Sequence, residues 1–502
     1  MNFSIRLLPL ALSLGLLVGC GSQVINPVTG QSERSVMSEA AELAEGKKAH
    51  EQVMQEYGVY NNPRLQAYVN EVGQKLARES HRANIPWTFT VLDSPEINAF
   101  ALPGGYVYIT RGILAYMESE ADMAGVIGHE IGHVTARHGA QRATRQQDAG
   151  LGVFAATILG AVLESQGVTG ATELAGQTAQ GVAAGYVAKY SREQELQADT
   201  LGAEYLSRTR YAPDNMVDVI QVLKSQEQYA SDVARAEGRP VSEGNSWLAS
   251  HPSNDQRLAS IRRIAAQYKN TGDYKDDGRQ RFLQAMEGVR FGESPEQGLT
   301  RGQHFYHSGL GIALTAPAGW RIQNAATSLT FVSPAGDAAL RMVTLPPKAG
   351  NSHEEIIRNA FKPTGGNTTR TQLNGFAATR FVGTQQAANG QTQNIEATIV
   401  TGPQQLHYAL LYLAANPAAR QQAQPGLKAV EQSFRAMSAA DTRAARPWQL
   451  RAVPFPRGGF AELERQAAPL PQAARQLRLL NGLYGAEADP PVGSLVKVVV
   501  EQ

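Results

Sequence analysis

The chain has 502 residues, of which 42% are hydrophobic and 18% are charged. This composition can supply a large buried core, so it excludes an intrinsically disordered protein and predicts roughly two to four domains. The 46 basic and 45 acidic residues give a net charge of +1. No global field therefore draws the chain toward nucleic acid or an anionic surface.

The N-terminus has the pattern of an export signal. Arg6 precedes the Leu-rich stretch Leu7 to Val18, which ends in Leu17-Val18-Gly19-Cys20. This ending resembles a bacterial lipobox, so we expect residues 1–19 to be a signal peptide and Cys20 to carry lipid. Because Gly21 rather than Asp follows the cysteine, the pattern favours a lipid anchor on the periplasmic face of the outer membrane. The alternative is an ordinary signal peptide with a chance cysteine.

The next segment predicts a small α+β unit. Apolar residues recur at helical spacing over residues 33–57, and a second helical pattern runs from Pro63 to about Leu76. Two alternating segments, Pro86–Leu92 and Gly105–Thr110, are typical of strands, and the second follows the turn Leu102-Pro103-Gly104-Gly105.

Residues 124–134 contain His-Glu-x-x-His within an apolar helical stretch. His129 and His133 are one helical turn apart on one face and can bind one metal ion, which places Glu130 beside it. In peptide hydrolysis, such a carboxylate takes a proton from water and later passes it to the leaving amine. A chance arrangement is the alternative. Cys20 is the only cysteine, which excludes both a disulfide and a zinc site built on several thiolates.

The segment Ala149–Val187 is rich in Ala and Gly, which predicts either closely packed helices or a flap over the site. Its apolar run Leu151–Leu163 is too short to span a bilayer. Further helical patterns cover Ser191–Ser207, Pro213–Tyr229 and Pro252–Tyr268.

A catalytic zinc commonly takes a third protein ligand, and the pattern after Ser191 offers candidates. Glu195 and Asp199 lie on one helical face, so Glu195 could bind the metal while Asp199 supports a ligating histidine. Glu193 points elsewhere. The alternative is a surface helix that carries three acidic residues.

Two further histidines are less clearly assigned. His251 precedes Pro252, which is well placed to start a helix, and a loop histidine is most often merely solvated. His138 lies five positions after His133 and would project from another face of a continuous helix, so we do not expect it to be a ligand.

The residue pattern changes in the second half of the chain. After a polar linker at residues 270–278, residues 305–438 predict a separate α+β domain without visible chemistry. Strand-like runs lie near residues 311–314, 329–332, 339–343 and 407–412, and helical patterns lie near 354–361 and 426–434. A second linker, residues 439–447, leads to a small unit at residues 448–502 with two short strands around two helices.

Taken together, the motifs resemble the HtpX and CAAX prenyl endopeptidase family of zinc metallopeptidases, and in particular its periplasmic BepA-like and LoiP-like lipoproteins. The matching segments are Asn26–Gly30, Asn98–Gly105, His129–His133, Ser191-Arg192 with Glu195 and Asp199, and His251-Pro252. The resemblance implies a mainly helical metallopeptidase domain of the gluzincin type over residues 20–295.

The resemblance also implies roles for individual residues. One zinc ion would be bound by His129, His133 and Glu195, with Asp199 in support. His251 would lie near the metal, where it could stabilise an oxyanion or occupy the open zinc position in a latent state. An extended substrate would pair with an edge strand, which we expect to be Gly105, Tyr106, Val107, Tyr108 and Ile109, because Pro103 and the paired glycines fit an edge rather than a central strand. The alternative is a plain hairpin strand.

The expected function is hydrolysis of peptide bonds in unfolded or misassembled envelope proteins. Residues 448–502 resemble a LysM module and could bind peptidoglycan, but Gly459-Phe460 follows Gly458 where such modules usually have Asp-Thr. A small docking or packing domain is therefore the alternative for this unit. Two other functions remain open, namely a non-catalytic periplasmic chaperone or scaffold and a peptidoglycan hydrolase.

Overall fold

The computed structural model of the protein describes residues 22–148, 190–236, 251, 255–268, 274, 276–325, 328–386, 392–486 and 488–502. The predicted signal peptide with Cys20, the Ala- and Gly-rich segment 149–187 and Pro252 lie outside the described residues. Within these ranges, no helix is both long and apolar enough to cross a bilayer.

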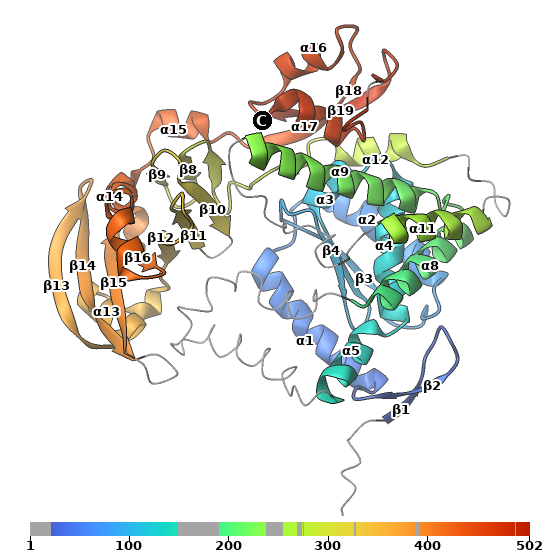
Figure 1. Cartoon of the computed structure of the whole chain (residues 1–502), viewed down its shortest axis with the longest axis horizontal. Helices are drawn as coiled ribbons and strands as arrows, with labels where there is room; N and C mark the ends of the chain where they lie inside the picture. The colour runs from blue at the N-terminus through green and yellow to red at the C-terminus, as the bar shows by residue number, and fades with distance from the viewer. Residues whose placement is uncertain are drawn as a thin grey trace, which may run out of the picture.

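The first half of the chain is a mainly helical domain around a small sheet (Figure 1), and the predicted α+β fold class is confirmed. Its helices are α1 (Glu39–Tyr57), α2 (Pro63–Arg78), α3 (Arg111–Tyr116), α4 (Glu120–Thr135), α5 (His138–Asp148), α8 (Arg192–Arg208), α9 (Asn215–Ala236), α11 (Asp255–Tyr268) and α12 (Arg279–Met286). Its strands are β1 (Ser22–Ile25) and β2 (Ser32–Ser35), which form a hairpin, and β3 (Thr88–Leu92), β4 (Ala99–Leu102) and β5 (Tyr106–Thr110).

Helix α4 carries the His-Glu-x-x-His motif and lies in the centre of this domain. A capping box starts the helix: the Ser119 hydroxyl accepts from the backbone N–H of Asp122, and the Asp122 carboxylate accepts from that of Ser119. Every residue of α4 is buried, because α2, α8, α9 and β4 all pack against it. A buried helix holds its side chains in fixed directions.

Glycines allow α4 and α8 to approach closely. A Cβ atom at Gly132 would lie 3.0 Å from the carbonyl oxygen of Ala198, and one at Gly202 would lie 3.1 Å from the backbone nitrogen of His129. Larger side chains at these positions would push the helices apart. The sequence of both helices therefore places Glu195 and Asp199 opposite the two histidines.

The sheet has the strand order β3-β5-β4, which corrects the prediction for the substrate strand. Strand β5 pairs in parallel with β3 and in antiparallel with β4, so Tyr106–Ile109 lie in the central strand and cannot be the edge. The Pro and Gly residues that favoured an edge strand lie in the turn before β5 instead. Among the described strands, β4 is the edge beside α4.

The second half contains a seven-stranded antiparallel sheet, seen on the left of Figure 1. Its order is β10 (Arg321–Ala325), β11 (Ser328–Val332), β12 (Ala338–Thr344), β16 (His407–Ala414), β15 (Thr392–Thr401), β14 (Phe376–Gln386) and β13 (Pro363–Leu373). Helices α13 (His353–Phe361) and α14 (Pro417–Ser433) contact this sheet. A four-stranded sheet adjoins it, with β17 (Arg435–Ala436), β9 (Ile312–Thr315), β8 (His304–His307) and β7 (Leu299–Arg301).

Two helices of this half differ from the sequence prediction, which also did not include strands β13, β14 and β15. Helix α14 begins at Pro417 rather than near Gly426 and contains Pro425, because the Asn416 side chain caps its start and the packed helix tolerates the internal proline. The predicted linker at 439–447 contains helix α15 (Ala439–Ala444), which a capping box of Ser438 and Asp441 starts.

The C-terminal unit consists of β18 (Trp448–Pro454), α16 (Gly459–Gln466), α17 (Ala473–Leu480) and β19 (Leu495–Glu501). Its strands pair in antiparallel, and β6 (Arg290–Phe291) adds a third strand from the segment that follows α12. The buried apolar side chains of both parts form one continuous cluster. The contacts therefore support the interpretation of residues 448–502 as a packing unit.

Lys497 joins this unit to the start of α4. Its side chain is 1% exposed, and its ammonium group donates to the carbonyl oxygens of Ala115, at 2.9 Å, and Met117, at 2.5 Å. The same group lies 2.8 Å from Oε1 of Glu118, the residue directly before the N-cap of α4. A buried charge is tolerated here because these three acceptors surround it.

We expect Lys497→Met to lower the free energy of unfolding by about 2–3 kcal/mol, because the acceptors lose a charged donor while the side-chain volume is kept. Urea unfolding of the full chain, followed by tryptophan fluorescence, measures this change. The matched control is Arg451→Met, whose exposed pair with Glu287 should contribute less than about 1 kcal/mol. Equal effects of the two substitutions would contradict the proposed importance of the buried contact.

Candidate metal centre

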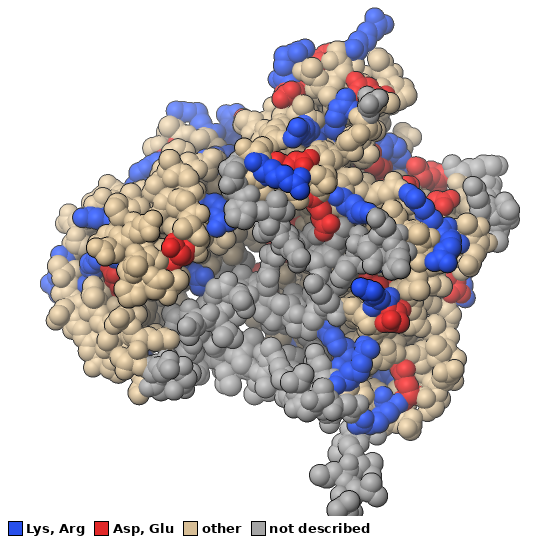
Figure 2. Space-filling view, viewed as in Figure 1, with Lys and Arg blue, Asp and Glu red and all other residues tan. Residues whose placement is uncertain are grey.

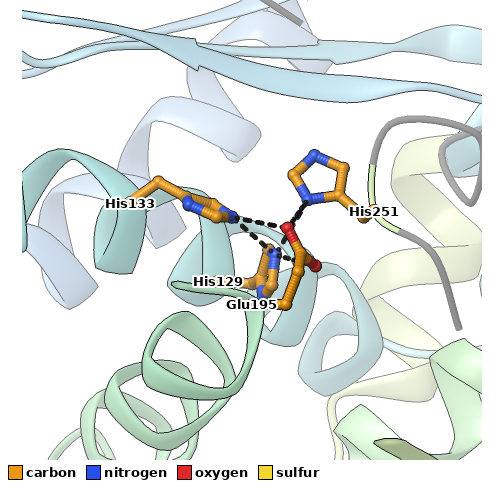
Figure 3. Close-up of side chains that lie close together, drawn as sticks. All are labelled: His129, His133, Glu195 and His251. Atoms are coloured by element: carbon orange, nitrogen blue, oxygen red, sulfur yellow. Dashed lines mark hydrogen bonds and ion pairs between the residues drawn. The ribbon is translucent and has the colours of Figure 1, made fainter. Parts of the chain in front are cut away.

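Four buried side chains converge at one point: His129 and His133 from α4, Glu195 from α8, and His251, which precedes α11. Figure 3 shows the Glu195 carboxylate pointing between the three imidazole rings. One ligand atom from each residue lies within 4.8 Å of all the others. Within the described ranges, no second group of His, Cys, Asp or Glu side chains meets this condition.

The spacing of these atoms fits a single zinc ion. Nε2 of His129 lies 3.0 Å from Nε2 of His133 and 3.2 Å from Nδ1 of His251. Oε1 of Glu195 lies 3.0 Å from Nδ1 of His251 and 3.5 Å from Nε2 of His133. A tetrahedral zinc ion with ligands at about 2.0–2.1 Å holds its ligand atoms about 3.3 Å apart. Imidazole nitrogen and carboxylate oxygen are also ligands that zinc prefers.

Asp199 orients the first histidine. Its Oδ1 lies 2.9 Å from Nδ1 of His129, on the far side of the ring from the converging atoms. An ionised carboxylate can only accept, so Nδ1 of His129 carries the hydrogen and Nε2 keeps its lone pair for a metal. Burial opposes the charge on Asp199, but Arg257 and His129 outweigh it and hold the pKa of Asp199 well below its usual range.

Arg257 is a site residue to which the sequence assigned no role. Its Nε and Nη2 each donate to Asp199 at 2.8 Å, and Nη1 lies 2.8 Å from Oε2 of Glu195. The same Nη1 donates to the carbonyl oxygen of His251 at 2.8 Å. One buried guanidinium group therefore balances two carboxylates and holds the His251 backbone. The sequence feature that could have indicated a role for Arg257 is its position six residues after His251, near the start of α11.

The second histidine of the motif has different neighbours. Tyr190 stacks on the His133 ring, with ring centroids 3.9 Å apart, and Nδ1 of His133 lies 2.8 Å from Nδ1 of His138. Burial, followed by the neighbouring histidines and Arg257, holds the pKa of His133 well below its usual range. Burial likewise lowers the pKa of His138 to about 4. As predicted, His138 is not one of the four converging residues.

Glu130 and His251 face each other across the site. Nε2 of His251 lies 3.6 Å from Oε1 of Glu130, and both side chains are 1% exposed. Burial opposes a charge on His251, but the carboxylates of Glu195 and Glu130 outweigh it and raise the pKa of His251. Glu130 thus lies beside the converging ligand atoms without being one of them, which suits a proton-transfer group.

The structure brings together all six residues that the sequence placed around the metal: His129, Glu130, His133, Glu195, Asp199 and His251. Glu193 is exposed and points away, as predicted. Tyr106, Val107, Tyr108 and Ile109 lie one strand further from the site than predicted, because β4 separates β5 from the edge.

Comparisons with known proteins agree with this geometry. Residues 63–265 match the model of peptidase family M48. The chain is 28% identical over 252 residues to the beta-barrel assembly-enhancing protease of Yersinia pestis, with 49% of each protein covered. It is 29% identical over 247 residues to the Escherichia coli protein of the same name, covering 48% of this chain and 47% of that protein.

A eukaryotic relative is also similar. The mitochondrial metalloendopeptidase OMA1 of Schizosaccharomyces pombe is 26% identical over 239 residues, covering 47% of this chain and 64% of that protein. The chain thus spans about half the length of the bacterial relatives that it matches. These matches agree with the family resemblance noted in the sequence, whereas the lipoprotein signal and the LysM-like unit stay predictions. The matched residues 63–265 contain the converging histidines and glutamate, so this part of the chain is similar to the metallopeptidases of family M48 in both sequence and candidate site.

Proposed function

We propose that this protein is a zinc-dependent endopeptidase in which His129, His133 and Glu195 bind the metal. The convergence of these side chains with Glu130 beside them is the observation that carries the proposal. Zinc bound there would supply a Lewis acid that polarises the scissile carbonyl group and activates water. The protein itself supplies the proton transfers and the binding of the peptide.

Glu130 is the proposed general base and acid. Its carboxylate takes a proton from the attacking water and passes it to the nitrogen of the leaving amine, so it is regenerated in each cycle. The residue follows His129 in α4, and the buried helix holds its carboxylate beside the ligand atoms. Burial keeps bulk water away from this group, which strengthens its interactions with the reacting atoms.

His251 is the proposed latency residue. Of the two roles considered from the sequence, the geometry favours occupation of the open metal position, because Nδ1 of His251 lies among the atoms of the other ligands. A metal ion held by all four protein groups would have no position left for water or substrate. Activation then requires His251 to move away, which would also release its contact with Glu130.

Strand β4 is the proposed place for the substrate, in place of the Gly105–Ile109 strand. Among the described strands it pairs only with β5, and it packs against α4. An extended peptide could add to this edge through backbone hydrogen bonds, which suits unfolded chains of varied sequence. A cavity of about 10 Å³, enough for about one water molecule, lies between Ala101–Pro103 and His133.

The proposed substrates are unfolded or misassembled envelope proteins, and the proposed location is the periplasm. The bacterial relatives are called beta-barrel assembly-enhancing proteases. The lipobox-like Cys20 supports lipid attachment to the outer membrane. Cationic and anionic side chains are interspersed on the face shown in Figure 2, which suits varied polypeptides better than a polyanion. Binding of the C-terminal unit to peptidoglycan stays a prediction.

We expect Glu130→Gln to keep zinc and lose casein hydrolysis by about 10²–10⁴-fold, since it removes a proton-transfer group without touching a ligand. Zinc content and casein cleavage, measured on the same preparations, test this. Glu195→Ala should lose both, and Glu193→Gln on the exposed side of α8 should change neither.

Casein hydrolysis by Glu130→Gln at the wild-type rate would overturn the mechanism, and zinc binding by a wild-type protein that never cuts would favour the chaperone or scaffold. Release of muropeptides from purified sacculi would favour the peptidoglycan hydrolase.

His251→Ala should raise casein hydrolysis at least severalfold at unchanged zinc content, because the substitution opens the fourth metal position. Initial rates normalised to bound zinc provide the measurement. A fall in the normalised rate would instead assign His251 to stabilisation of the transition state.

Arg257→Leu should lower the stability of the metal-free protein by about 3–5 kcal/mol, because two buried carboxylates lose their cation. Zinc should restore much of this loss, since it supplies positive charge at the same place. The difference in thermal midpoint between zinc-loaded and chelator-treated protein should therefore be larger in this variant than in wild type. Arg208→Leu, which removes an exposed pair with Glu204, serves as the control.

A further inference from the structure

A buried chain of hydrogen bonds leads away from the metal centre through His138. Nδ1 of His133 lies 2.8 Å from Nδ1 of His138, and Nε2 of His138 lies 2.9 Å from Oε1 of Gln197. His133 is 2% exposed and His138 is fully buried, while Gln197 on α8 is half-buried. Helices α4, α5 and α8 thus contribute one residue each to a line of hydrogen bonds that ends at the candidate metal centre.

A break in the helix brings His138 to this position. Helix α4 ends at Thr135, and Arg137 has a left-handed backbone with φ of 58°. Its guanidinium group donates to Glu42 at 3.0 Å and to the carbonyl oxygen of Met37 at 2.9 Å, which holds this conformation. The helix is thus interrupted before α5 starts at His138, and the His138 ring meets the ring of His133 instead of projecting from another face.

Gln197, at the far end of this line of hydrogen bonds, determines which nitrogen atoms donate and which accept. The side-chain oxygen of Gln197 can only accept, so Nε2 of His138 donates to it and carries a hydrogen. The other nitrogen of a neutral imidazole, Nδ1, then accepts the hydrogen from Nδ1 of His133. Nε2 of His133 is left with its lone pair pointing toward Glu195 and His129. This is the tautomer that binds a metal.

We propose that His138 and Gln197 are positioning residues, which hold the ring and the tautomer of the zinc ligand His133. This inference rests on the proposed function, because it takes zinc as the ion. The two histidine ligands then differ in support: His129 has the anionic partner Asp199, whereas His133 has a neutral line that ends in an amide. A carboxylate at position 197 would make the two supports alike.

Zinc affinity tests this role, because supporting partners of a ligand typically change metal affinity by about 10–100-fold. We expect His138→Leu to weaken zinc binding by about this factor in the full chain, measured by competition with a chromogenic chelator. His138→Gln should weaken it less, since the amide oxygen can still accept from His133. Gln197→Glu should tighten zinc binding severalfold because a carboxylate is a stronger acceptor, whereas Gln197→Ala should weaken it.

A control separates this role from simple packing. His81→Leu removes a half-buried histidine that lies outside the site and is hydrogen-bonded to the hydroxyl of Tyr205 at 2.9 Å, so it should leave zinc affinity unchanged. If His138→Leu does not fold, the opposite effects of Gln197→Glu and Gln197→Ala still decide. Wild-type zinc affinity in His138→Leu, or equal zinc affinities in the two Gln197 variants, would overturn this inference but leave the proposed function standing. A wild-type protein that binds no zinc would overturn the proposed function instead.

Discussion

The metal centre depends on how closely α4 can approach α8. The motif on α4 supplies two histidines and a glutamate, but Glu195, the proposed third ligand, and Asp199, the partner of His129, both come from α8. Gly132 and Gly202 leave no side chain between the two backbones, so the helices pack at a distance that a larger residue would prevent. Replacing a glycine here would therefore act on the site through the distance between helices and without touching a ligand.

The close packing of α4 and α8 brings several charged side chains together in a buried space, where the buried carboxylates from α8 are paired with a cation. Asp199 and Glu195 both pair with Arg257, which is itself buried. Unpaired carboxylates would be costly there or would take up protons, and a protonated carboxyl group supports a zinc ligand poorly. The same guanidinium group holds the backbone of His251, so charge balance and the position of the fourth group are coupled.

Support for the start of α4 comes from a part of the chain nearly four hundred residues away. Lys497 on β19 contacts carbonyl groups of Ala115 and Met117 and the carboxylate of Glu118, and the apolar side chains of the C-terminal unit continue the core of the metallopeptidase half. A unit that shares a core with its neighbour cannot move freely as a separate binding module. Any ligand bound by residues 448–502 would therefore contact a surface that is rigidly attached to the metallopeptidase half.

The sequence by itself determined what depends on local spacing: two histidines one turn apart, Glu130 beside them, and Glu195 and Asp199 on one face of a second helix. It also determined the longer helices of the first half and several strands, whose patterns have periods of 3.6 and two residues, but it did not identify β4, β13, β14 or β15. Only the tertiary structure decided that β5 is central and β4 is the edge, because strand order depends on contacts between distant segments. It also placed His138 behind His133, since the left-handed Arg137 ends the helix that spacing alone would continue. Arg257 joined the site for the same reason: its carboxylate partners come from another helix.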